Sequence, residues 1–201
     1  MSEQTQPSFT IPPKPTDNLF LAIFPDANTA EPIAQLAQQL RTRCGLRGKQ
    51  LAADRFHMTL YSFNVLEADL QAVSKACAAA AASTPPFEVG FNRALSFAGR
   101  ASNHPFVLRS SDDSAALQEF FRSLDVELKD CGFSSRGKLK FTPHITLLFD
   151  KQIIAKQSID PVSWTANEFF LVHSLVGESR YIRLARWALH GSPAQGVFRL
   201  L

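Results

Sequence analysis

The sequence predicts an α+β protein built from two lobes that face each other. Three observations lead to this fold class. Apolar segments typical of strands alternate with amphipathic helical segments along the chain. The tetrapeptide His57-Met58-Thr59-Leu60 recurs as His144-Ile145-Thr146-Leu147, and each copy lies in a strand-like apolar run. Each copy also follows a helical segment and a basic loop, so the chain is an imperfect internal duplication. A Rossmann fold is excluded, because no glycine-rich phosphate loop follows a predicted strand.

The first half of the chain alternates strands and helices. Residues 1–17 are rich in proline and poor in large apolar side chains, and we expect a flexible tail. Asp26 or Asn28 can cap the first helix, which we expect to stop at Gly45. The expected elements are a buried strand at 19–24, a helix between Asp26 and Gly45, a strand at 56–63 with the first motif, and an alanine-rich helix at 69–82.

The second half adds strands around one further helix. Ser111 can cap that helix, and Gly177-Glu178-Ser179 can form the turn of a closing hairpin. The expected elements are strands at 87–97 and 106–109, a helix at 111–131, the second motif strand at 141–149, and hairpin strands at 172–176 and 182–189. We therefore place one domain at 18–190, with a C-terminal tail at 191–201.

Composition and cysteine spacing favour a globular domain over a membrane protein or a disulfide-linked protein. The 201 residues are 19% charged and 45% hydrophobic with a net charge of +3, which suits a globular domain and permits a polyanionic partner. Cys44, Cys77 and Cys131 are widely spaced without a CxxC pair, so we expect three reduced thiols in a cytoplasmic protein. We expect no membrane association, because there is no signal-peptide pattern and no apolar run near the roughly 20 residues that span a bilayer.

The two repeated motifs each place a histidine and a threonine on one face of a strand. Side chains alternate across a strand, so His57 and Thr59 point the same way and the residues between and after them point to the other face. His144 and Thr146 repeat this arrangement. The apolar residues can anchor each strand in a core, while the polar residues meet in a cleft between the lobes.

Such a pair of motifs suits metal-free cleavage of a phosphodiester. One imidazole can take a proton from the attacking water while the other protonates the leaving oxygen, and the threonine hydroxyls can donate to the phosphate oxygens. No metal and no cofactor is needed. Taken singly, each motif is more often structural than functional. A zinc site with His57 and His144 as ligands lacks the further ligands that zinc requires.

The chain resembles the 2H phosphoesterase superfamily, and within it the bacterial RNA 2′,3′-cyclic phosphodiesterase family, also named 2′-5′ RNA ligase. The resemblance covers about residues 18–190. The stretches that carry it are LFLAIF, RFHMTL, FTPHITLL, Glu168-Phe169 to Ser174, and Arg180-Tyr181 to Arg186-Trp187. It implies a two-lobed, pseudo-duplicated fold with antiparallel sheets flanking a central cleft.

The resemblance also implies an activity and residue roles. The activity is hydrolysis of RNA 2′,3′-cyclic phosphate ends to 2′-phosphates, with reversible 2′-5′ RNA ligation as a related reaction. His57 would donate the proton, His144 would accept one, and Thr59 and Thr146 would hold the phosphate. The expected partner is an RNA or nucleotide with a 2′,3′-cyclic phosphate, without cofactor, and the expected state is a monomer.

The chain departs from the family pattern at three places. Asn18 and Phe149 stand where the family often has arginines, and Tyr61-Ser62-Phe63-Asn64 replaces a customary Phe-Leu-Gly. Both His-x-Thr sets remain intact. Three alternatives stay open: a substrate that is a small cyclic nucleotide, one that is an ADP-ribose cyclic phosphate, or a non-catalytic RNA-binding module.

We expect the other notable polar residues to be structural or exposed to solvent rather than catalytic. We expect His173 to pack in the core and His104 and His190 to be exposed. The basic loop before the second motif could contact an RNA backbone but is better explained as a solvated loop; its residues are Arg136, Lys138 and Lys140.

Overall fold

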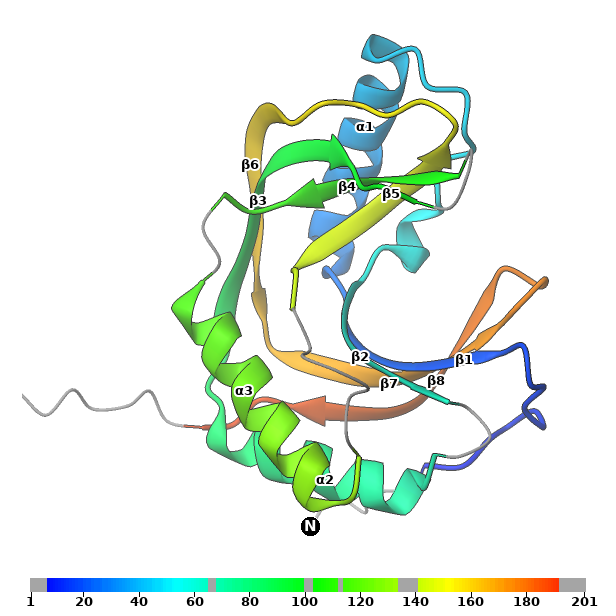
Figure 1. Cartoon of the computed structure of the whole chain (residues 1–201). Coiled ribbons are helices and arrows are strands. Elements are labelled where there is room, and N and C mark those ends of the chain that lie inside the picture. Colours follow the sequence, from blue (N-terminus) through cyan, green and yellow to red (C-terminus); the bar gives the residue numbers. More distant parts are fainter. Residues whose placement is uncertain (1–6, 65–67, 100–102, 112–113, 134–140, 192–201) are drawn as a thin grey trace, which may run out of the picture.

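The computed structural model describes residues 7–64, 68–99, 103–111, 114–133 and 141–191. Within these ranges the chain forms two four-stranded antiparallel sheets and three α-helices, which confirms the predicted α+β class (Figure 1). The first sheet has the order β2-β1-β7-β8, with strands Met58–Asn64, Asn18–Ile23, Glu168–Leu175 and Arg180–Ala188. The second sheet has the order β5-β4-β3-β6, with strands His144–Asp150, His104–Arg109, Phe87–Ser96 and Gln157–Ala166.

The internal duplication extends to the register of the motif strands. Strands β2 and β5 are both edge strands, and each pairs antiparallel with one inner strand. In β2 the register shifts after Thr59, which leaves Leu60 without a partner in β1. In β5 it shifts after Thr146, which leaves Leu147 without a partner in β4. Both irregularities therefore fall on the fourth residue of the motif, and such bulges re-aim neighbouring side chains.

The first helix belongs to one half of the sequence but packs on the sheet of the other half. Helix α1 (Ala27–Arg43) follows β1, and contacts β6 of the second sheet (Figure 1). The Asp26 carboxylate caps it by accepting from the Thr29 N–H at 2.8 Å, and Gly45 ends it at a φ of 66°. Its first turn thus lies near the first sheet while its buried face lies over the second.

The other two helices pack against each other. Helix α2 (Leu70–Ser83) contacts β8, and helix α3 (Ala115–Asp130) contacts β3 (Figure 1). The predicted start of the third helix was wrong: Ser114, not Ser111, accepts from the first turn. Ser111 instead exchanges two hydrogen bonds of 2.8 Å with the Asn92 side chain, so it is held on β3.

Strand β6 has no counterpart among the predicted elements. Its sequence, QSIDPVSWTA, is polar and contains Pro161, so it lacks the apolar run of the other strands. It is an edge strand, where a proline does not interrupt a second ladder of hydrogen bonds. Strand β7 also begins at Glu168, earlier than the predicted residue 172.

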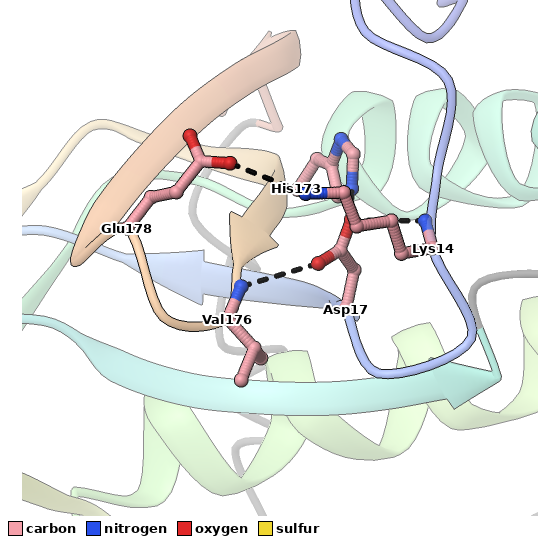
Figure 2. A network of polar contacts seen from close by, with 5 residues as sticks. All are labelled: Lys14, Asp17, His173, Val176 and Glu178. Carbon is pink, nitrogen blue, oxygen red and sulfur yellow. Dashed lines mark hydrogen bonds and ion pairs between the residues drawn. The ribbon is translucent and has the colours of Figure 1, made fainter.

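The N-terminal segment docks on the first sheet through Asp17. This carboxylate is buried and accepts from the His173 ring at 2.9 Å and from the Val176 N–H at 3.1 Å (Figure 2). The Phe9 ring contacts His173 edge-on at 5.1 Å, and Lys14 forms an exposed ion pair with Glu178. His173 is fully buried, as predicted.

Two apolar clusters lie on the sheets. The larger cluster contains residues from both sheets and all three helices, so the lobes share one core. The smaller cluster contains Phe20, Ala22, Phe170 and Val172, and Tyr181 packs against it. Among the described residues, no helix is long and apolar enough to cross a membrane.

Candidate active site

The two motifs present their polar side chains on one face, as the alternation predicts. His57, Thr59, His144 and Thr146 are partly exposed. The alternate residues are buried: Met58, Ile145 and Leu147 at 0% exposure and Leu60 at 3%. The apolar side chains anchor the motif strands in the shared core, so the polar side chains have fixed positions at its surface.

The two histidines make the same local hydrogen bond. The His57 Nδ1 lies 2.7 Å from the carbonyl oxygen of Arg55, and the His144 Nδ1 lies 2.8 Å from the carbonyl oxygen of Thr142. A carbonyl oxygen only accepts, so each Nδ1 must carry the hydrogen. Nε2 is then the atom that gains or loses a proton in both rings.

The loop before the first motif is bound to the strand of the second motif. Leu51 donates its backbone N–H to the Leu147 carbonyl at 2.8 Å, and Gln50 forms a bridge with Leu148. The Asp150 carboxylate accepts from the N–H groups of Arg47 and Gly48 at 2.7 and 2.6 Å. This strap, residues 47–51, holds the chain that leads to His57 against β5, on which His144 lies.

The two imidazoles interact electrostatically. Burial lowers the pKa of His57 to about 4, although the bond to the Arg55 carbonyl raises it; the charges of His144 and Arg55 lower it further. Burial also lowers the pKa of His144, opposed by the bond to Thr142 and assisted by the charge of Arg109. Both rings are therefore neutral at pH 7 in the unliganded protein, and an anion between them would favour protonation.

Aromatic and basic side chains surround His57. The Phe20 ring stacks on it at 4.9 Å, and the Tyr181 ring meets it edge-on at 5.4 Å. The Arg55 guanidinium lies 4.7 Å from the centre of the Tyr181 ring and donates to its hydroxyl at 3.3 Å. Arg55 thus brings a positive charge beside the imidazole while Tyr181 fixes its position.

His144 has a similar but smaller set of neighbours. The Phe97 ring meets it edge-on at 5.0 Å. Arg109, its partner in the register between β4 and β5, is close enough for its charge to lower the pKa of His144. The Arg109 Nε is buried and has no hydrogen-bond partner among the described residues. A guanidinium therefore stands beside each histidine.

Sequence reasoning missed these neighbours. Arg55 lies within the RFHMTL stretch, which was a usable signal, but Arg109 ends β4 and Phe97 directly follows β3, and no motif marks either position. Tyr181 lies in the Arg180-Tyr181 stretch, where the sequence suggests no role for it. Of the two positions that lack a family arginine, Asn18 is exposed and Phe149 is 43% exposed.

The remaining predicted polar residues lie elsewhere. His173 is in the Asp17 network, and His190 is exposed as expected. His104 is only partly exposed, and its Nδ1 accepts from the Gly99 N–H at 3.0 Å. The loop with Arg136, Lys138 and Lys140 lies outside the described residues. Within the described part of the chain, no three His, Cys, Asp or Glu side chains group as metal ligands would, and the cysteines are free thiols.

Paired imidazoles that both titrate at Nε2 can perform general acid and base catalysis at one centre. The flanking guanidiniums and the threonine hydroxyls suit an anion, because all of these groups are hydrogen-bond donors. The arrangement is therefore suited to a reaction at a phosphorus centre in which one oxygen gains a proton as another loses one.

Comparisons with known proteins give the family and support the fold. The model of the 2′-5′ RNA ligase superfamily matches residues 19–178. The fold is similar to TT0787 of Thermus thermophilus, with a TM-score of 0.72, 18% identity, and 88% of this chain and 100% of that chain covered. It is also similar to apo LigT of E. coli, with a TM-score of 0.63, 24% identity, and coverage of 86% and 96%.

LigT has also been solved with nucleotides. In its ATP complex, LigT is 26% identical to this chain with a TM-score of 0.60. The match covers 86% of this chain and 97% of the LigT chain. Other LigT structures contain NADP⁺, 3′-AMP or phosphate. No curated protein sequence matches the chain.

Proposed function

The chain belongs to the 2′-5′ RNA ligase superfamily, and from this premise we propose that it hydrolyses 2′,3′-cyclic phosphate ends of RNA to 2′-phosphates. The observation that carries the proposal is the matched pair of imidazoles. Each has its Nδ1 bound to the carbonyl oxygen two residues earlier, which leaves Nε2 as the atom that titrates, and the charge of His144 affects the pKa of His57.

The proposed reaction is an in-line displacement by water. The His144 Nε2 takes a proton from the water as its oxygen attacks the phosphorus. The bond from phosphorus to the 3′ oxygen breaks, and the His57 Nε2 gives that oxygen a proton. The products are a free 3′ hydroxyl and a 2′-phosphate. His57 ends neutral and His144 protonated, so a proton exchange with solvent restores the starting state.

Charge and hydrogen bonding support these roles. The phosphate anion between the rings favours the protonated form of His57, whose pKa is about 4 without it. Thr59 and Thr146 lie on the same face as the histidines, and their hydroxyls would donate to the two non-bridging oxygens as charge builds up. Arg55 and Arg109 would add positive charge on either side. Metal-free turnover is part of the proposal.

The surroundings of the reaction remain proposals as well. We propose that the working unit is the domain at 18–190, active as a monomer in the cytoplasm. We also propose that 2′-5′ ligation is the same displacement with the 5′ hydroxyl of another strand in place of water, so that the bond to the 3′ oxygen again breaks. The nucleotide complexes of LigT support a nucleotide-containing substrate.

The test uses a short oligoribonucleotide with a 2′,3′-cyclic phosphate end. Phosphorus NMR of the product separates a 2′-phosphate from a 3′-phosphate. We expect the 2′-phosphate alone. A 3′-phosphate product would contradict the stated bond cleavage. Binding without turnover would favour the non-catalytic RNA-binding alternative, and turnover of an ADP-ribose cyclic phosphate alone would favour the small-molecule alternative.

A further inference from the structure

A cavity beside the candidate active site is rich in arginine. It has a volume of about 380 Å³, and its wall includes Phe24, Asp54, Arg55, Arg180, Tyr181 and Arg183. Three guanidiniums face one carboxylate. Within the described part of the chain, none of the three arginines forms an ion pair, whereas Arg186 on the same strand pairs with Glu168 at 3.5 Å. The cavity, which we call the arginine pocket, therefore has uncompensated positive charge.

The arginine pocket shares a wall with the site of the imidazoles. The Tyr181 ring contacts His57 on one side, and lines the pocket with the Arg55 guanidinium stacked on it. The Arg183 guanidinium lies 4.4 Å from the ring centres of both Phe24 and Phe170, so it is held in place. The Arg55 Nε is buried without a hydrogen-bond partner in the described residues. Aromatic rings therefore hold the guanidiniums of Arg55 and Arg183 at the wall of the pocket, and Arg55 keeps a buried N–H donor without a partner in the described residues.

A second cavity nearby has the opposite character. It has a volume of about 530 Å³ and shares Phe24, Asp54 and Arg183 with the arginine pocket. Its other charged residues are carboxylates: Asp26, Glu31 and Glu168. An anionic part of the substrate would be repelled there, and attracted to the arginine pocket.

On the basis of the proposed function, we propose that the arginine pocket binds a second phosphate of the substrate, the one on the 5′ side of the cyclic end. In an RNA this group is the internucleotide phosphate, and in a small nucleotide it is a 5′-phosphate. Arginine suits either source because its planar fork of donors matches phosphate oxygens. The pocket would thus make the enzyme prefer substrates with a phosphate beyond the reacting one.

Three substrates with the same 2′,3′-cyclic end test this. The first is a nucleoside with a 5′ hydroxyl, the second has a 5′-phosphate, and the third is a dinucleotide. We expect a higher kcat/KM for the third than for the first. In Arg180→Gln and in Arg183→Gln, kcat/KM for the dinucleotide divided by kcat/KM for the 5′-hydroxyl nucleoside should fall about tenfold. This factor corresponds to the lower end of the free energy of a hydrogen bond to a charged group. In Arg186→Gln, the matched control on the same strand, the ratio should stay at its wild-type value.

The outcomes separate the two sources and the two proposals. If the second and third substrates both have a higher kcat/KM than the first, by the same factor, any 5′-phosphate is sufficient for binding in the pocket. If only the third has a higher kcat/KM than the first, the pocket recognises the internucleotide phosphate of RNA. Equal kcat/KM for all three substrates, or an unchanged ratio in Arg180→Gln and Arg183→Gln, would overturn the arginine pocket while the proposed function stands. If no substrate is turned over, the proposed function fails. Equilibrium binding of the dinucleotide to His144→Ala, with and without Arg180→Gln, still decides the pocket.

Discussion

The backbone N–H of Leu51 donates to the carbonyl oxygen of Leu147 at 2.8 Å. This bond joins the segment before the first motif to the strand of the second motif. Gly48 lies in the same strap, close to the backbone of Phe149. The strap therefore binds the chain that leads to His57 to the strand that contains His144, although it contains no residue of either motif.

The first prediction is that Gly48→Ala disturbs the strap. A Cβ at this position would meet the Phe149 carbonyl oxygen far inside van der Waals distance, so the backbone must shift. We expect a loss of stability of about 1–3 kcal/mol, as for other overpacked sites, and a lower kcat/KM. Thermal unfolding and steady-state kinetics measure both. Gly90→Ala is the control, because its Cβ would make ordinary contacts; an equal effect in the two variants would contradict the role of the strap.

The second prediction is that catalysis requires both histidines and no metal. His57→Ala and His144→Ala should each lower kcat by about 10²–10⁴-fold, the usual contribution of a general acid or base. Activity of the wild type should persist in EDTA. A loss of activity in chelator that a divalent ion restores would show that the acid–base mechanism is incomplete. His190→Ala, at an exposed position, is the control.

A third prediction concerns pH. Burial lowers the pKa of both histidines, that of His57 to about 4. The free enzyme needs one ring protonated and the other neutral, so kcat/KM should follow a bell with its optimum below about pH 6.5, the ordinary pKa of histidine. The two apparent pKa values that define the limbs of the bell are properties of the coupled pair of histidines, not of either residue alone. Bound phosphate favours protonation, so the limbs of kcat should lie at higher pH. A flat profile from about pH 5 to 9 would rule out the paired role.

The fourth prediction separates phosphate binding from packing at the threonines. Thr→Val keeps the shape and the β-branching but removes the hydroxyl donor. Thr59→Val and Thr146→Val should each lower kcat/KM by at most roughly 10²–10³-fold, the range for one oxyanion donor. The unfolding midpoint should change little, because strands accept valine at least as well as threonine. Full activity in both variants would exclude the hydroxyl role, and unfolding of either would make the threonine structural.

The fifth prediction concerns the docking of the N-terminal segment. The hydrogen bond from the Lys14 backbone N–H lowers the pKa of Asp17 against the effect of burial, with His173 and Val176 contributing further. A lowered carboxyl pKa gives stability that is present above the unfolded value, near pH 4, and is lost as the pH falls through the folded pKa. Asp17→Asn should lower the thermal midpoint at pH 7, because an amide has one accepting oxygen where the carboxylate uses two.

The control for this variant is Asp160→Asn, at an exposed position of β6. The difference between wild type and Asp17→Asn should shrink below about pH 4. A midpoint unchanged at pH 7, or a difference that is independent of pH down to about 2, would contradict the docking role of the carboxylate.

Local pattern was sufficient for most elements and for the faces of the motif strands. Alternation correctly placed His57 and Thr59 at the surface and Met58 and Leu60 in the core, because the period of a strand is fixed by its backbone. Caps and glycines marked the first helix at Asp26 and Gly45. Pattern failed at β6, whose polar residues become a strand only because β3 offers them an edge.

The sequence by itself determined the two His-x-Thr strands, the α+β class and the duplicated order of elements, since each depends on neighbours along the chain. Only the tertiary structure decided that α1 packs on the sheet of the other half, that residues 47–51 bind β5, and that Tyr181 and Arg55 lie beside His57. These contacts join residues far apart in the chain. Their partners are selected by the burial of apolar faces and the pairing of strand edges, which the local pattern of one segment does not encode.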